Sequence, residues 1–235
     1  MRTYWYNRVA NFGDRLGPVI MERMGIPAEW APPAQAEIVT AGSILSQLPP
    51  RWRGIVLGSG LIASSRGADL SRARVLAVRG ALTRDRLGLH RGTLLADPGI
   101  LAPFLMPTGA PEQPGIVVAP HYIDDELARR YPLARELDVT DHPLDVIAGL
   151  AGADLVITSS LHVAIAADAL GILHVVEPHP KVVGGLFKFE DYASAFGLGI
   201  EPGIPRLTPR PQMEARQEEL RDYYLSLVSN RRAIA

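Results

Sequence analysis

Short apolar runs alternate with amphipathic stretches along most of the chain. The apolar runs are rich in Val, Ile and Leu and are nearly continuous, which is typical of strands covered on both faces of a parallel sheet. The stretches between them carry apolar residues at a helical period. This alternation predicts βαβ units and therefore an α/β fold.

The same pattern sets the limits of the expected elements, with glycines at many of the joints. The predicted strands are Glu37–Thr40, Gly54–Leu57, Arg74–Val78, Gly115–Ala119, Leu137–Val139, Leu155–Thr158 and Leu173–Val176. The predicted helices are Asp14–Met24, Ile44–Leu48, Arg79–Leu87, Asp124–Tyr131, Pro143–Ala151 and His162–Leu170.

Prolines and polar residues interrupt the pattern in the segment PFLMPTGAPEQP, residues 103–114. This interruption predicts an N-terminal Rossmann-like domain over residues 1–108 and a C-terminal Rossmann-like domain over residues 109–207. Residues 208–235 have apolar side chains near one face and predict a C-terminal helix. We expect the two domains to face a cleft, with ligands outside the carboxyl ends of the strands.

Composition narrows the classes of function. The chain has 235 residues, with 24 Lys and Arg against 25 Asp and Glu, and this balance gives no electrostatic footprint for nucleic acid. It has no cysteine, which excludes disulfides, thiolate metal sites and cysteine nucleophiles. The start, MRTYWYNRVANFGD, lacks the apolar region of a secretory signal, and no apolar run reaches the roughly 18 residues of a membrane span. We therefore expect a cytoplasmic protein, and contact with a membrane surface stays open.

Candidate chemistry in the first half lies at the predicted joints. Asn11 and Asp14 flank a glycine, and they are either an ordinary turn with Asp14 as helix cap or a pair that binds an acceptor hydroxyl. Gly58, Ser59 and Gly60 follow a predicted strand, where their amides either approach an anion or form a simple turn. The dinucleotide fingerprint is incomplete there.

Two charged residues end the next strands. Arg79 stands where a strand becomes a helix, and its guanidinium suits a carboxylate or phosphate. Asp97 follows at a predicted strand end and is equally typical of a turn.

The second half adds histidines and a lysine. His121 follows a strand, and His162 lies near the start of a helix, where a neutral imidazole is favoured. Ser159 and Ser160 precede it and suit a helix cap. Lys188 follows two glycines, which predicts a flexible loop presenting charge to the cleft. We find no convincing metal-ligand spacing and expect no metal.

The order of these motifs is more specific than any one of them. The series NFGDRLGPVI, LGSGLI, VRGALT, ADPGIL, APHYID, SSLHVAIAADALGI and KFEDY resembles the polysaccharide pyruvyltransferase family, in particular its exopolysaccharide ketal-forming members, over roughly residues 7–197. The resemblance implies a GT-B-like fold of two domains. It also implies an enzyme that transfers pyruvate from phosphoenolpyruvate, as co-substrate and without a cofactor, to a glycan or lipid-linked saccharide as a cyclic ketal.

The resemblance also implies roles for residues. His162 matches the family's histidine after leucine and would be the acid/base, with His121 as second choice. Asn11 and Asp14 would suit the acceptor. The donor would be bound by Arg79, Lys188, Ser159, Ser160 and the amides of Gly58, Ser59 and Gly60. Many members carry an arginine where this chain has Ser160.

Two other functions remain open. One is a nucleotide-sugar-dependent glycosyltransferase of the same architecture, which would bind a nucleoside diphosphate. The other is a non-catalytic saccharide-binding relative, for which His162 would be dispensable.

Overall fold

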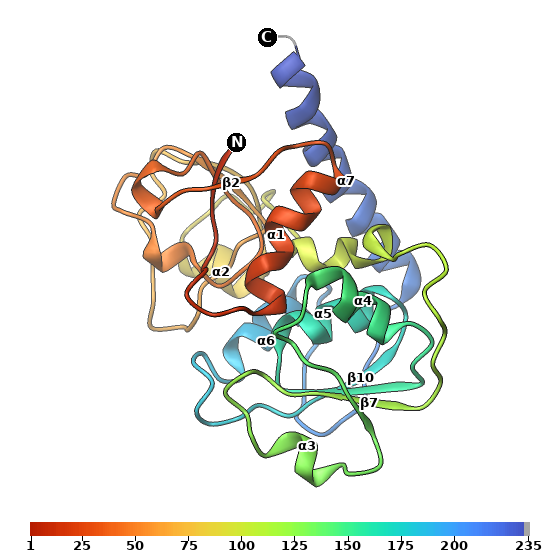
Figure 1. The fold of residues 1–235 in the computed structure, drawn as a ribbon. Helices are drawn as coiled ribbons and strands as arrows, with labels where there is room; N and C mark the ends of the chain where they lie inside the picture. Colours follow the sequence, from red (N-terminus) through yellow and green to blue (C-terminus); the bar gives the residue numbers. More distant parts are fainter. Residues whose placement is uncertain (233–235) are drawn as a thin grey trace.

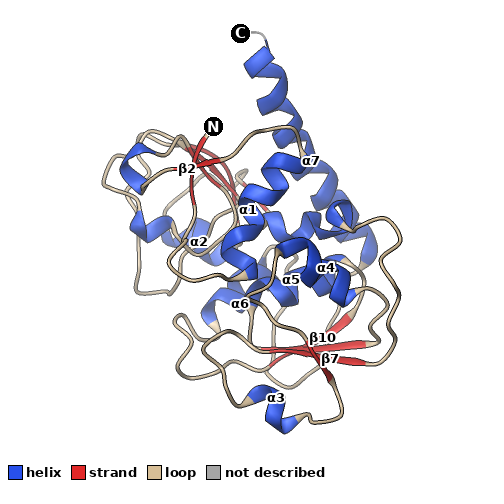
Figure 2. Ribbon diagram, viewed as in Figure 1, coloured by secondary structure: helices blue, strands red, loops and turns tan. Residues whose placement is uncertain are grey.

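The computed structural model describes residues 1–232 and consists of two parallel β-sheets with helices between and around them. The predicted α/β class with parallel sheets is confirmed. Figure 2 shows α1, α4 and α5 lying between the two groups of strands. In Figure 1, the amino-terminal sheet lies to the upper left of these helices and the second sheet lies below them.

The first sheet has six strands in the order β2-β1-β3-β4-β5-β6. Its strands are β1 (Arg2–Tyr4), β2 (Glu29–Trp30), β3 (Ile38–Val39), β4 (Ile55–Leu57), β5 (Arg74–Val78) and β6 (Leu94–Leu95). Its helices are α1 (Phe12–Arg23), α2 (Ala81–Arg86) and the 3₁₀ helices η1 (Pro33–Gln35), η2 (Leu45–Gln47) and η3 (Pro98–Leu105).

The second sheet has four strands in the order β10-β9-β7-β8. Its strands are β7 (Ile116–Ala119), β8 (Arg135–Glu136), β9 (Leu155–Thr158) and β10 (Leu173–Val176). The helices of this half are α3 (Leu127–Arg130), α4 (Pro143–Leu150), α5 (Leu161–Ala169) and α6 (Phe187–Ser194), and α7 (Arg210–Arg232) follows.

One hydrophobic core connects the two sheets. A single cluster of buried side chains contains Leu57 of β4, Phe12 of α1, Val117 of β7 and Val156 of β9. Helix α5 packs closely on η3, where a Cβ at Gly99 would lie 2.8 Å from Cγ2 of Ile165. The helices in the middle of the molecule therefore bury their side chains against both sheets at once.

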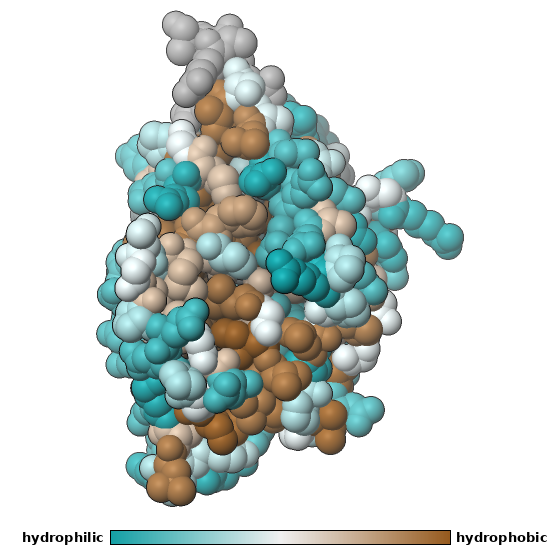
Figure 3. Space-filling model, turned by 90° about the vertical axis from the view of Figure 1, so that its right-hand side faces the viewer, coloured by the Kyte–Doolittle hydropathy of each residue, from teal (hydrophilic) through white to brown (hydrophobic). Residues whose placement is uncertain are grey.

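Helix α7 runs along one side of the molecule (Figure 1) and attaches through Met213, Leu220, Tyr224 and Leu227. The predicted C-terminal helix is confirmed for residues 210–232, and residues 233–235 lie outside the described part. On the face seen in Figure 3, polar side chains are interspersed with apolar ones, and the apolar ones gather mainly in its lower half. Within residues 1–232, no helix is both long and apolar enough to cross a bilayer.

The strands Arg74–Val78, Leu155–Thr158 and Leu173–Val176 are confirmed at their predicted limits. The strand predicted at Leu137–Val139 is wrong by two residues, because β8 pairs with β7 through Arg135 and Glu136. Val139 has left the sheet, and its carbonyl accepts the Phe12 N–H at 2.7 Å at the start of α1.

Two other predictions need correction. Residues 184–192 were expected to form a flexible loop, but α6 begins at Phe187. Phe189, Tyr192 and Ala193 give this segment a buried apolar stripe at helical spacing, and that stripe holds it on the core. Residues Ile44–Leu48 contain the 3₁₀ helix η2 instead of an α-helix.

Candidate functional site

In both sheets, the carboxyl ends of the strands face one cleft. In the first sheet the strand order reverses beside β1 and β3, and in the second beside β7 and β9. The loops after these strands supply Tyr6, Ser43, His121 and Ser160 to a cavity of about 430 Å³. Ligands of open α/β sheets bind at the carboxyl ends of strands where the order reverses, so this cavity, called the cleft below, is the candidate site.

Six of the predicted site residues line the cleft, and they come from both halves of the chain. They are Asn11, Asp14, His121, Ser160, His162 and Lys188.

The start of α1 supplies a carboxyl and an amide. Asn11 Nδ2 donates to Asp14 Oδ2 at 2.8 Å. Burial raises the pKa of the Asp14 carboxyl to about 6, against the opposing effects of the Asn11 bond and of the Lys188 charge. Asn11 Oδ1 is buried without a partner in the described part of the chain, so it can accept a hydroxyl hydrogen from a ligand. Of the two roles left open for Asp14, that of helix cap is wrong, because Asn11 is the N-cap of α1 and makes no side-chain cap bond.

Lys188 is the buried cation of the cleft. It lies in the first turn of α6 and is 5% exposed. Burial and the nearby Arg79 charge lower the pKa of its ammonium to about 8. Among residues 1–232, no carboxylate lies within ion-pair distance of Lys188. A buried ammonium without a close counter-ion favours an anionic ligand.

His162 lies in the first turn of α5, against the wall of the cleft. Burial lowers the pKa of its imidazole to about 3, and the charges of Arg79 and Lys188 act in the same direction. The ring is therefore neutral at pH 7 and can accept a proton. Its Nε2 is 3.7 Å from Asp97 Oδ2.

His121 faces the cleft from the loop after β7. Burial, together with the Lys188 charge, lowers the pKa of its imidazole to about 4. Its Nδ1 accepts the Ile123 N–H at 3.3 Å, and its ring centroid lies 4.4 Å from that of Tyr122. The His121 ring thus stabilises, through these contacts with Tyr122 and Ile123, the loop on which it lies.

The two serines do not cap α5 through their side chains, contrary to the prediction. Ser160 is the N-cap residue, but its side chain makes no cap bond and its own N–H donates to Thr158 Oγ1 at 2.9 Å. Ser159 is fully buried, and its Oγ accepts the His121 N–H at 2.9 Å. Ser159 therefore connects the loops after β7 and β9.

Arg79 lies behind the wall of the cleft and is fully buried. Its Nε donates to Asp191 Oδ2 at 2.9 Å, and its other nitrogens donate to Ser43 Oγ and to the Leu61 carbonyl. Asp191 lies on α6, one turn after Lys188. The ion pair therefore fastens the helix that carries Lys188 to the first half of the chain.

The segment from Gly58 to Gly60 also lies behind this wall. The N–H groups of Gly58 and Gly60 already donate to the carbonyls of Ala77 and Gly42. A Cβ at Gly60 would overlap the Arg79 guanidinium, so the glycine makes room for that side chain. Ser59 is fully buried.

Sequence reasoning did not single out Tyr6, Arg66 or Tyr122, which also line the cleft. Tyr122 directly follows His121, so the strand end that led to the histidine could have led to it. Arg66 is an exposed cation in a loop without a regular pattern, and no signal in the sequence distinguishes it from other surface arginines.

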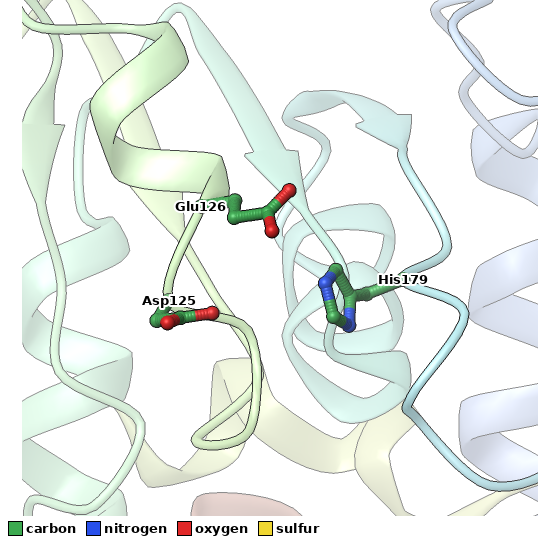
Figure 4. A group of neighbouring side chains, drawn as sticks. All are labelled: Asp125, Glu126 and His179. Carbon is green, nitrogen blue, oxygen red and sulfur yellow. The ribbon is translucent and has the colours of Figure 1, made fainter.

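A second cluster contains Asp125, Glu126 and His179, with one ligand atom of each within 4.8 Å of the others (Figure 4). The Lys181 N–H points to His179 Nδ1 at 3.3 Å, so the neutral ring carries its proton on Nε2. The nitrogen left for a metal would then be protonated. This geometry favours a hydrogen-bonded cluster over an ion site.

Comparison with known proteins identifies the class. The family model described as polysaccharide pyruvyl transferase matches residues 54–176, more than half of the chain. This protein therefore belongs to the polysaccharide pyruvyl transferase family, which confirms the resemblance found in the sequence.

One similar protein is the succinoglycan biosynthesis protein ExoV of Rhizobium meliloti (strain 1021), 25% identical over 216 residues. The match covers 85% of this chain and 66% of ExoV, so the chain spans somewhat less than two thirds of that relative's length. A solved structure of an uncharacterized protein from Klebsiella pneumoniae subsp. pneumoniae NTUH-K2044 aligns with a TM-score of 0.44 and 15% identity. That alignment covers 77% of this chain and 84% of the other.

Proposed function

We propose that this protein transfers pyruvate from phosphoenolpyruvate to two hydroxyls of a glycan or lipid-linked saccharide, giving a cyclic ketal, in exopolysaccharide or cell-surface glycan synthesis. Family membership and the similarity to ExoV, a succinoglycan biosynthesis protein, support the class of reaction. The observation that carries the proposal is one cleft that gathers a buried, uncompensated lysine and three titratable side chains with shifted pKa values.

The donor is an anion with a phosphate and a carboxylate, and Lys188 is placed to bind it. The start of α5 adjoins Lys188 in the cleft, and the first amides of a helix attract negative charge. These two features would take the place of the family arginine at Ser160. Arg79 would not contact the donor. It would support the site by holding α6 in place through Asp191 and by adding positive charge near Lys188.

The atoms of the transfer balance without a cofactor. The first hydroxyl oxygen bonds to carbon 2 of the donor, and its proton ends on carbon 3, which becomes a methyl group. The second hydroxyl oxygen then replaces the phosphate on carbon 2, and its proton leaves with the phosphate. The protein must therefore take up and return protons next to the donor.

We assign the first proton transfer to His162. Burial and the neighbouring cations keep its imidazole neutral at pH 7. The negative charge of a bound phosphate beside it would raise its pKa and its basicity. Asn11 Oδ1 and the Asp14 carboxylate would hold the acceptor hydroxyls, and His121 is the second candidate for proton transfer.

The proposal includes the GT-B-like arrangement of two domains, with boundaries after residues 108 and 207. This arrangement is supported by the two sheets, because in each of them the loops after the strands where the order reverses line the cleft. We further propose the cytoplasm as the site of the reaction.

The proposal is tested by incubating the protein with phosphoenolpyruvate and a panel of saccharides, scored by mass. Addition of the pyruvyl ketal with release of one phosphate per ketal is expected, and His162→Gln should abolish it. Thermal stabilisation by UDP or GDP, and none by millimolar phosphoenolpyruvate, would instead favour a nucleotide-sugar glycosyltransferase.

A further inference from the structure

Asp97 and His162 form a buried carboxylate–imidazole pair beside the cleft. Asp97 follows β6, is fully buried and is the N-cap of η3, where its Oδ1 accepts the Gly99 N–H at 2.8 Å. Its other oxygen, Oδ2, is buried without a hydrogen-bond partner in the described chain. His162 Nε2 is also buried without one, and it lies 3.7 Å from that oxygen.

Two unsatisfied buried polar atoms that face each other call for an explanation, because each costs free energy when it is left unpaired. An imidazole N–H and a carboxylate oxygen satisfy each other after a small ring rotation. Burial raises the pKa of Asp97 to about 6, so its carboxyl is mostly ionised at pH 7 and above and can accept this proton. The charges of Arg79 and Asp191 also act on Asp97, and those two residues are paired with each other.

Glycines on both sides fix the distance between the pair. A Cβ at Gly13 of α1 would collide with His162 Nδ1, so the ring lies directly against the α1 backbone. At Gly99 a Cβ would come within 2.8 Å of Ile165 on α5, so η3 and the helix of His162 approach closely. The ring therefore has little freedom to turn away from Asp97.

The other ring nitrogen, Nδ1, makes no hydrogen bond within residues 1–232 and is not enclosed like Nε2. His162 lines the cleft, and Asp14, the next residue after Gly13, lines it too. Nδ1 is thus the ring atom that a ligand in the cleft can reach.

We propose that Asp97 is a positioning residue for His162: its Oδ2 holds the ring proton on Nε2 and so leaves the Nδ1 lone pair for the ligand. Asp97 itself does not touch the substrate. When Nδ1 takes a proton from an acceptor hydroxyl, the imidazolium that forms is stabilised by the carboxylate behind it. The assignment of Nδ1 as the reacting atom rests on the proposed function, whereas the tautomer does not.

The tautomer is measured directly on the ¹⁵N-labelled protein by long-range ¹H–¹⁵N correlation of the histidine rings, with His162→Gln to assign the signals. A protonated Nε2 and an unprotonated Nδ1 are expected for His162 at pH 7. A proton on Nδ1 would overturn the proposal without any reference to activity.

Asp97→Asn provides the second test. The amide oxygen keeps the bond to the Gly99 N–H, and the amide nitrogen then faces Nε2, which inverts the tautomer of His162. We expect kcat to fall by about 10²- to 10⁴-fold with KM for phosphoenolpyruvate little changed. An unchanged tautomer would contradict the proposal. So would an equal loss of kcat/KM that came from a higher KM alone.

Asp124→Asn is the matched control. Asp124 is also a buried carboxyl that accepts backbone N–H groups at a helix start, those of Glu126 and Leu127, and it lies 3.9 Å from another histidine, His179. This substitution should leave the His162 signals unchanged. If the expected tautomers are found but the wild-type protein transfers no pyruvate, the pair stands and the proposed function fails.

Discussion

The Arg79–Asp191 pair gives a quantitative prediction. Asp191 accepts hydrogen bonds from Arg79 Nε at 2.9 Å and from the N–H and Oγ1 of Thr83 at 2.7 Å each, and both ionic side chains are fully buried. Asp191→Asn removes the negative charge and leaves the guanidinium uncompensated. Breaking a buried pair in this way costs about 3–5 kcal/mol.

In a chain of 235 residues, each kcal/mol lowers Tm by about 2–4 °C, so the expected fall is about 6–20 °C. Urea denaturation followed by circular dichroism, with an unchanged m-value, measures the free energy directly. A loss below about 1 kcal/mol would refute the reasoning, because the pair would then contribute no more than a surface contact.

Two variants control for the charge change. Asp85→Asn removes an ion pair with Arg84 in which the Asp85 side chain is 64% exposed, and it should cost less than about 0.5 kcal/mol. Replacing both partners, Arg79→Met with Asp191→Leu, should recover much of the lost stability, since no buried charge then remains unpaired.

Three further predictions concern the cleft. Lys188→Met should weaken phosphoenolpyruvate binding about 10- to 100-fold in calorimetry, whereas Lys181→Met, the other lysine of the chain, should not. Burial raises the pKa of Asp14 from 3.8 to about 6, so its contribution to stability is lost as the pH rises through that interval. Urea denaturation measures the difference in free energy of unfolding between Asp14→Asn and the wild type, and this difference should be up to about 3 kcal/mol more favourable to the variant at pH 7 than at pH 4. Equal differences at both pH values would argue against the burial effect. Gly13→Ala should cost about 1–3 kcal/mol and displace His162, while Gly67→Ala, with open space around it, should be neutral in both respects.

The sequence carried enough information for the longer strands and for the joints. Strands such as Leu155–Thr158 are continuous apolar runs, and these were found at their limits. The strands β2 and β6 have two residues each, too few to show any period. For this reason β2 was missed, and of β6 only the end before Asp97 was predicted. Their pairing depends on neighbours that are distant in sequence.

The candidate site was predictable residue by residue but not as an arrangement. His162 and Lys188 follow from their local motifs, and both line the cleft. Arg79 was found at its strand end, but its partner Asp191 lies 112 positions later, and only the packed structure places this arginine behind the wall. The facing atoms of Asp97 and His162 likewise depend on the close packing of η3 on α5.

The continuous core described above fixes the width of the cleft. Spreading the two sheets apart would expose Leu57, Phe12 and Val156 to water, at about 25 cal/mol for each Å² of apolar surface. Because this core joins them, we expect the two halves to resist opening and closing about a hinge. Under the proposed function, we therefore expect that shortening Tyr122 or Val183, which line the cleft, admits a bulkier saccharide.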